Sequence, residues 1–254
     1  EGMRVLAWAQ QMYDDCKGLE RELSALRLGM EGHFRLGVLP GTSAIAPTLS
    51  VALAEKIPRL HQSINVSNAP SLLQAIRDNE LDMALMHLDN LPKEGFDTHL
   101  LYRERLFLFL TARAKQPRAV TWEQVLNRQL CLLKSAVAEA VEEKLTQCIA
   151  QTIHTESMEV LAAQLAAGKY SAVLPESLAS RLPDIPNLRA IAIVGPISHS
   201  SVGFVARKNA FDSAPSRALL EMVHTPELVT SLRTVMSVYR RFQSKADASD
   251  HDQE

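Results

Sequence analysis

The residues best placed for chemistry in this sequence lie between Pro40 and Ser43. The preceding residues Phe34–Val38 alternate between apolar and other side chains, which predicts a β-strand. Thr42 or Ser43 is then expected to cap a helix whose apolar stripe runs from Ile45 to Ile57. Backbone N–H groups, hydroxyls and the helix dipole would point the same way at this corner, which suits a small anion. An ordinary capping role for both hydroxyls is the alternative, and similar corners recur twice along the chain.

Histidines and carboxylates form no recognisable catalytic or metal-binding pattern. No G-x-G-x-x-G, P-loop, H-E-x-x-H or G-x-S-x-G motif occurs, and the eight histidines lack ligand spacing. We therefore expect no catalytic residue, metal site or cofactor, and favour a binding protein over an enzyme. His87, at the end of a predicted strand, is expected to face the cleft, and a satisfied, partly buried histidine is the alternative.

Composition indicates an ordinary globular protein. The chain has 254 residues, 46% of them apolar and 22% charged, and a net charge of −2. A net charge of this size does not favour direct binding of nucleic acid by this part of the chain. No apolar run reaches the ~20 residues that are needed to span a membrane. Cys16, Cys131 and Cys148 are too few and too scattered for a secreted disulfide framework, so we expect a reduced, cytoplasmic protein. Cys131 and Cys148 are expected to be core residues, with a thiol redox sensor as the alternative.

Residues 1–31 are predicted to form a separate long helix. Apolar residues recur there at alternating steps of four and three, the spacing of a two-stranded coiled coil. We expect this helix to be a linker that dimerises, and an amphipathic helix packed on its own domain is the alternative. The residues assigned to the dimer seam are Met12, Leu19, Leu23 and Leu26.

The rest of the chain predicts two β-α-β units of similar size. The first starts at residue 34 and is followed by strands at Thr98–Tyr102 and Leu106–Thr111. Residues Ala112–Arg118 are predicted to connect two lobes, and the pattern then restarts at Leu130. A cleft between the lobes is expected, with ligands bound where helices follow strands. Residues 244–254 are predicted to form a disordered acidic tail.

Four segments together resemble LysR-type transcriptional regulators. EGMRVLAWAQQM with the heptad helix is similar to their linker helix, and HFRLGVLPGTSAIAPTLSVALAEKIP resembles the start of their effector-binding domain. LLQAIRDNELDMAL and MEVLAAQLAAGKYSAVLPESLA resemble later segments of its two lobes. Each motif is loose alone, but their order and spacing are specific, and the likeness runs from Glu1 to about Phe242. The winged helix-turn-helix of the family would precede Glu1.

The resemblance implies a two-lobed α/β fold like the type 2 periplasmic binding proteins. The domains expected are a linker helix at 1–31, lobe I at 32–111, lobe II at 112–206, and a return to lobe I with closing helices at 207–243. The chain would cross between the lobes near Ala112 and near Arg207. A transport solute-binding protein is the alternative with the same architecture.

The resemblance also implies a small effector in the cleft of a bacterial regulator. Lys134 and the helix N-termini would suit a carboxylate or another anion. The protein would be a homodimer or homotetramer, with DNA and RNA polymerase contacted only through the full-length regulator. The predicted effector-binding residues are Pro40, Gly41, Thr42, Ser43, Asn68, Ala69, His87, Lys134, Ser135, Thr155 and Glu156.

Overall fold

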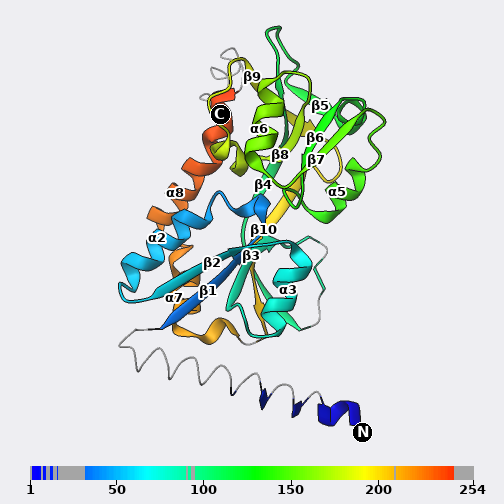
Figure 1. Ribbon diagram of the computed structural model, residues 1–254. Helices are drawn as coiled ribbons and strands as arrows, with labels where there is room; N and C mark the ends of the chain where they lie inside the picture. The colour runs from blue at the N-terminus through cyan, green and yellow to red at the C-terminus, as the bar shows by residue number, and fades with distance from the viewer. Residues whose placement is uncertain are drawn as a thin grey trace.

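The computed structural model describes residues 2–6, 8, 9, 12, 13, 16, 32–89, 91, 92, 95–208 and 210–242. Figure 1 shows two halves, one above the other, with strands β4 and β10 running between them. We call the lower half, with β1 to β3, lobe I, and the upper half, with β5 to β9, lobe II. Buried apolar residues cluster separately in the two halves, so each lobe has a core of its own.

The elements alternate between strands and helices along most of the chain. The strands are β1 His33–Val38, β2 His61–Val66, β3 Met83–His87, β4 Phe96–Thr111, β5 Ala119–Thr121, β6 Leu130–Leu133, β7 Thr152–Thr155, β8 Ala172–Pro175, β9 Leu188–Val194 and β10 His199–Arg207. The α-helices are α2 Ala46–Lys56, α3 Ala69–Arg77, α4 Trp122–Leu126, α5 Glu139–Leu145, α6 Met158–Ala166, α7 Ala214–Met222 and α8 Pro226–Ser237. Short 3-10 helices are η1 Pro40–Thr42, η2 Glu176–Arg181, η3 Ala210–Asp212 and η4 Val238–Phe242.

Lobe I is built on the predicted β-α-β-α-β unit. Strand β1 pairs in parallel with β2 on one side and with β3 on the other, and β10 then pairs antiparallel with β3. Arg35 of β1 links this strand to the residues just before β3. It donates from Nη2 to Asp82 Oδ1 at 2.5 Å and from Nη1 to the Asn79 carbonyl at 2.8 Å. Asn79 has a φ of 55°, a left-handed conformation that asparagine tolerates better than most residues.

Lobe II repeats the arrangement around the second half of β4. There β4 pairs antiparallel with both β8 and β9, and β6 pairs in parallel with β7. A bridge between Leu130 and Ser171 joins these two groups of strands. Helix α5 ends at Leu145, where the chain turns, and the Cys148 thiol then lies 3.2 Å from the Leu126 carbonyl.

The two strands expected at Thr98–Tyr102 and Leu106–Thr111 are one strand of 16 residues. Residues Phe96–Arg105 of β4 pair with β10, whereas Leu106 and the residues after it pair with β8 and β9. The chain therefore enters lobe II at Leu106, and the predicted crossing near Ala112 is wrong. No turn residue marks the passage, because an extended strand passes from one sheet to the other without a break.

The return crossing also lies earlier than the predicted Arg207. Strand β9 ends in lobe II at Val194, and β10 pairs in lobe I from His199 onwards. Between them, Gly195 has a φ of 111° and Ile197 one of 54°. A left-handed conformation is a clear outlier for a β-branched residue, so this short link is strained.

The C-terminal helices do not stay on lobe I as expected for residues 207–243. Leu228 and Leu232 of α8 belong to the lobe I core, but Phe242 of η4 is buried in the lobe II core. The Tyr239 ring is tilted against that of Phe107 in β4, with 4.4 Å between the ring centroids. The segment α8–η4 thus straps one lobe to the other (Figure 1).

The described part of the N-terminal segment is helical and exposed. Val5 and Met12 are 68% and 66% exposed, and Trp8 is 68% exposed. The other seam residues, Leu19, Leu23 and Leu26, and the predicted tail at 244–254 lie outside the described residues. Among the described helices, none combines the length and apolar character needed to cross a bilayer.

Candidate functional site

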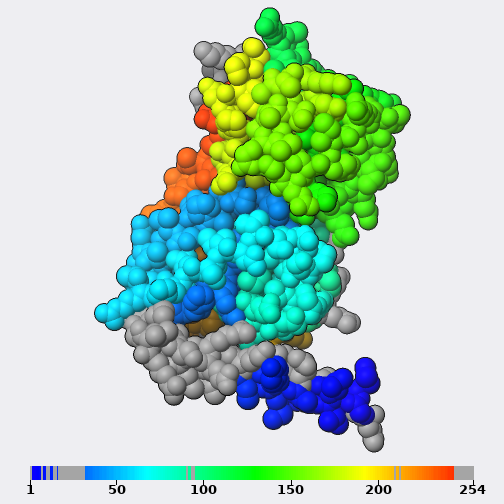
Figure 2. Space-filling model, in the orientation of Figure 1, coloured from blue at the N-terminus to red at the C-terminus, as the bar shows by residue number. Residues whose placement is uncertain are grey.

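The predicted corner after β1 lies where the two lobes meet. The Gly41 N–H donates to the Ser135 carbonyl at 2.9 Å, across the boundary between the lobes. A Cβ atom on Gly41 would lie 2.3 Å from the Ala136 carbonyl oxygen, so only glycine fits here. Ala44, a few residues later, is buried in the lobe II core. Figure 2 shows the two halves in contact at the waist of the molecule.

Neither Thr42 nor Ser43 caps a helix, so this part of the prediction is wrong. The 3-10 turn η1 is inserted after β1, and helix α2 begins only at Ala46, without a side-chain cap. The Thr42 hydroxyl is fully buried and reaches the Leu39 and Leu85 carbonyls at 3.1 and 2.9 Å. Ser43 donates to the Pro40 carbonyl at 2.8 Å and is half-buried. Both hydroxyls therefore hold the turn in shape.

The second corner of lobe I follows β2. The Asn68 side chain accepts from the Ser71 N–H at 3.0 Å and caps α3, in which Ala69 is the first residue and Pro70 the second. The Ser67 N–H donates to the Val38 carbonyl at 3.1 Å, which keeps this corner beside the end of β1. Asn68 is exposed and Ala69 is half-buried.

The predicted lobe II residues do gather in one place. Strands β6 and β7 are parallel and end together, and the Lys134 N–H donates to the Thr155 carbonyl at 2.9 Å. The Lys134 ammonium lies 2.9 Å from Glu156 Oε1, and this hydrogen bond raises the pKa of Lys134 and lowers that of Glu156. Both side chains are exposed, so solvent screening leaves their attraction weak.

Ser135 is held by a residue that the sequence analysis missed. Its N–H donates to Glu142 Oε1 at 2.7 Å, and its φ of 55° is unusual for a serine. Glu142 lies in α5, in the turn that follows the predicted corner. The sequence signal that could have identified Glu142 is its position as an acidic residue in the first turn of a helix, where backbone N–H groups are available.

His87 faces the same boundary but is not available as a charged ligand group. It ends β3 at 4% exposure, and burial lowers its pKa to about 4, although Asp89 and the nearby Ala136 backbone oppose this shift. Neither ring nitrogen has a hydrogen-bond partner of full geometry. The buried neutral ring indicates packing at the boundary between the lobes. It therefore differs both from a histidine that faces a cleft and from the satisfied, partly buried histidine of the alternative.

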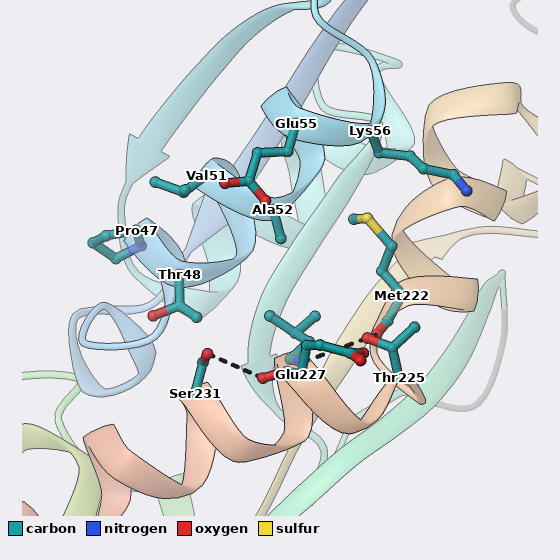
Figure 3. A pocket seen from close by; sticks show the side chains of 11 residues that line it. Pro47, Thr48, Val51, Ala52, Glu55, Lys56, Met222, Thr225, Glu227 and Ser231 are labelled. Atoms are coloured by element: carbon teal, nitrogen blue, oxygen red, sulfur yellow. Dashed lines mark hydrogen bonds between the residues drawn. The ribbon is translucent and has the colours of Figure 1, made fainter.

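A separate groove of about 700 Å³ lies on the outer side of lobe I, between α2 and the segment 222–231. Figure 3 shows Thr48 and Ala52 of α2 on one wall, and Thr225 and Ser231 on the other. None of the predicted effector-binding residues lines it. In the described ranges, no three His, Cys, Asp or Glu residues gather as they would around a metal ion. The inter-lobe corner is thus the candidate site.

Comparisons with known proteins find a family and its fold. The family model described as the LysR substrate binding domain matches residues 27–225. The nitrogen assimilation regulatory protein Nac of Klebsiella aerogenes is 28% identical over 188 residues, which cover 71% of this chain and 61% of that protein. The HTH-type transcriptional regulator CbbR of Rhizobium meliloti is 29% identical over 85 residues, 34% of this chain and only 27% of that protein. Full-length CbnR, solved with its target DNA, superposes with a TM-score of 0.61 at 16% identity, over 92% of this chain and 80% of that one.

The Gly41–Ala136 contact predicts that Gly41→Ala pushes the lobes apart. The added Cβ would overlap the Ala136 carbonyl, so we expect the melting temperature to fall by roughly 3–10 °C. Scanning calorimetry measures this, with Gly2→Ala as the control because nothing lies within 4 Å of that position. An unchanged melting temperature in Gly41→Ala would show that the two turns are not in contact.

The buried His87 predicts acid lability. Its pKa falls from 6.5 to about 4 on folding, so the unfolded chain binds more protons between these values, and stability is lost as the pH falls from 6.5 to 4. The loss amounts to about 3 kcal/mol, at about 1.4 kcal/mol per pKa unit. Urea titrations at pH 7 and pH 4.5 should show this loss reduced in His87→Gln and retained in His154→Gln, which alters an exposed histidine of β7. Equal acid sensitivity of the parent and His87→Gln would contradict this assignment.

Proposed function

The chain belongs to the LysR substrate-binding domain family, and we propose that it senses a small effector for a transcriptional regulator that also carries a DNA-binding domain. The proposal is supported by the extent of the family match and by relatives that are transcriptional regulators. Contacts with DNA and RNA polymerase would be made by the full-length protein. Because a bacterial regulator binds DNA in the cytoplasm, a cytoplasmic location is part of the proposal. The transport alternative is not favoured, because the relatives are regulators.

The observation that carries the proposal is the contact between the lobes at Gly41 and Ser135. A ligand held between the turns on either side of this contact would touch both lobes at once. It would therefore bind with different affinity as the lobes approach or separate, and that difference shifts the population between the two arrangements. No enzymatic step is needed for such a switch.

The effector that we propose is a small anion, such as a carboxylate. Lys134 supplies the positive charge, and its only described ion-pair partner, Glu156, is exposed. An incoming anion can replace Glu156 at little cost because an exposed pair gains little from its own attraction. Asn68 is exposed on the lobe I side and could donate from its side-chain amide, whereas Thr42 contributes by holding the turn.

We also propose that lobe I takes part in self-association, as a homodimer or homotetramer. Strand β2 is an edge strand, and Ile64 and Val66 are 43% and 54% exposed on it. Val51 on the neighbouring helix α2 is 60% exposed. An apolar, unpaired strand edge is a template for pairing with another chain, so a second copy of this chain is the proposed occupant.

The anion proposal predicts opposite effects at the two members of the Lys134–Glu156 pair. Lys134→Ala removes the cation and should weaken binding of a carboxylate at least tenfold, whereas Glu156→Gln frees the cation and should strengthen it. Thermal shift followed by calorimetric titration at constant ionic strength measures this, comparing acetate, benzoate and citrate with acetamide and benzamide. Lys115→Ala in an exposed loop is the matched control. Amides that bind as tightly as the acids, or carboxylate binding unaffected by Lys134→Ala, would exclude an anion at this corner.

The edge-strand proposal predicts a smaller assembly for Val66→Lys. A charge on the β2 edge should block pairing between copies and lower the mass measured by light scattering after size exclusion. Ile149→Lys is the control, because Ile149 is 83% exposed but lies between α5 and β7 in lobe II. A parent-like mass for folded Val66→Lys, checked by circular dichroism, would show that β2 is not an interface.

A further inference from the structure

Four side chains with buried polar atoms that lack a hydrogen bond of good geometry gather where the lobes join. Glu104 of β4 is 0% exposed. Neither carboxyl oxygen makes a hydrogen bond of good geometry, although Ser177 lies near enough to affect its pKa. The hydroxyls of Tyr102, Ser177 and Ser200 are likewise buried and make no hydrogen bond of good geometry. We call these four residues the hinge cluster. Buried polar atoms are nearly always hydrogen-bonded, so such a group requires a physical explanation.

The cluster is assembled from both lobes. In the ladder between β4 and β10, Glu104 lies opposite Ser200, and Tyr102 two residues earlier lies on the same face. Ser177 belongs to η2, whose apolar residues are part of the lobe II core. Two residues after Glu104, the Leu106 N–H donates to the Ser198 carbonyl at 2.9 Å, where both crossing strands pass between the lobes. Movement of lobe II about this crossing would carry Ser177 away from Glu104.

The surroundings of Glu104 keep its carboxyl neutral. Burial raises its pKa to about 8, Glu176 adds to the rise, and Ser177 beside it opposes the rise. The charged and titratable neighbours are Tyr102 on its own strand and Glu176 on η2; Arg105 and Arg240 act on Glu176. Among the residues that the structure describes, none forms an ion pair with Glu104. A buried carboxylate without a cation is costly, so this group holds its proton.

We propose that Glu104 is a proton-dependent latch between the lobes: its neutral carboxyl is sealed against Ser177 when the lobes are together, and it ionises when η2 moves away and water enters. Closing the lobes then takes up one proton from solvent, and opening releases it. The carboxyl is exposed to water only in the open arrangement, so higher pH favours opening. The latch is a property of the lobes alone and does not depend on which effector binds.

The direction and range of the effect follow from the two states of Glu104. Between its ordinary pKa of 4.5 in water and about 8 in the closed arrangement, the ratio of open to closed molecules rises roughly tenfold per pH unit. Above about pH 8 the ratio levels off, because Glu104 is then ionised in both arrangements. The pKa of His87 is lowered to about 4, so His87 does not contribute to a change between pH 6.5 and 8.

Amide hydrogen exchange without any effector tests the latch. The Gly41 N–H bonds Ser135 across the lobes, so its protection factor reports closure. In the full chain we expect this factor to fall by at least tenfold from pH 6.5 to 8 and then to level off. Glu104→Gln, which keeps the shape of the neutral carboxyl, should remove the pH dependence and keep the lobes closed. Amides within β3 and β9 serve as the reference for global unfolding.

Two further variants complete the test. Glu123→Gln alters an exposed carboxyl of α4 and should behave as the parent does. Ser177→Ala leaves Glu104 in place but removes a group that opposes its pKa rise, so the pH at which protection levels off should move upward. This second variant also covers the case in which Glu104→Gln does not fold. The latch is excluded if protection of Gly41 in the parent does not change with pH, or if the change is the same in Glu104→Gln or Ser177→Ala.

Discussion

One strand belongs to two sheets, and this constraint organises the molecule. Residues Phe96–Arg105 of β4 take their hydrogen bonds from β10, and Leu106–Thr111 take theirs from β8 and β9. Every buried backbone group on the strand must find a partner in one sheet or the other. The change of partner therefore sets where the lobes meet, and it places Glu104 and Ser198 at the boundary.

Local patterns in the sequence predict the elements well. The alternation in Phe34–Val38 and the restart of the pattern at Leu130 both depend on neighbours a few residues away, and strands lie at both places. The crossing points could not be predicted in this way. A strand that passes between sheets has the same alternation throughout, so only pairing with distant strands shows where one sheet ends.

For the candidate site, too, the sequence indicates features that depend on near neighbours and misses those that depend on distant ones. Resemblance to a family placed Gly41 and Ser135 on opposite sides of one cleft, and the structure brings them into contact. The role of Thr42 was wrong because an extra turn precedes α2, and the hydroxyl then finds nearby carbonyls in place of a helix end. Glu104 lies between two arginines in the sequence and looks like a surface residue there. Its burial depends on η2, which comes more than seventy residues later.

The strap formed by α8 and η4 has a mechanical consequence. The two strands that pass between the lobes, β4 and β10, lie side by side. If they were the only connection, one lobe could rotate about them until side chains of the two lobes collided. The helix attaches to both cores away from this line, with Leu232 in one and Phe242 in the other (Figure 1). Because this third attachment lies away from the line of the crossing strands, it restricts how far one lobe can turn about them.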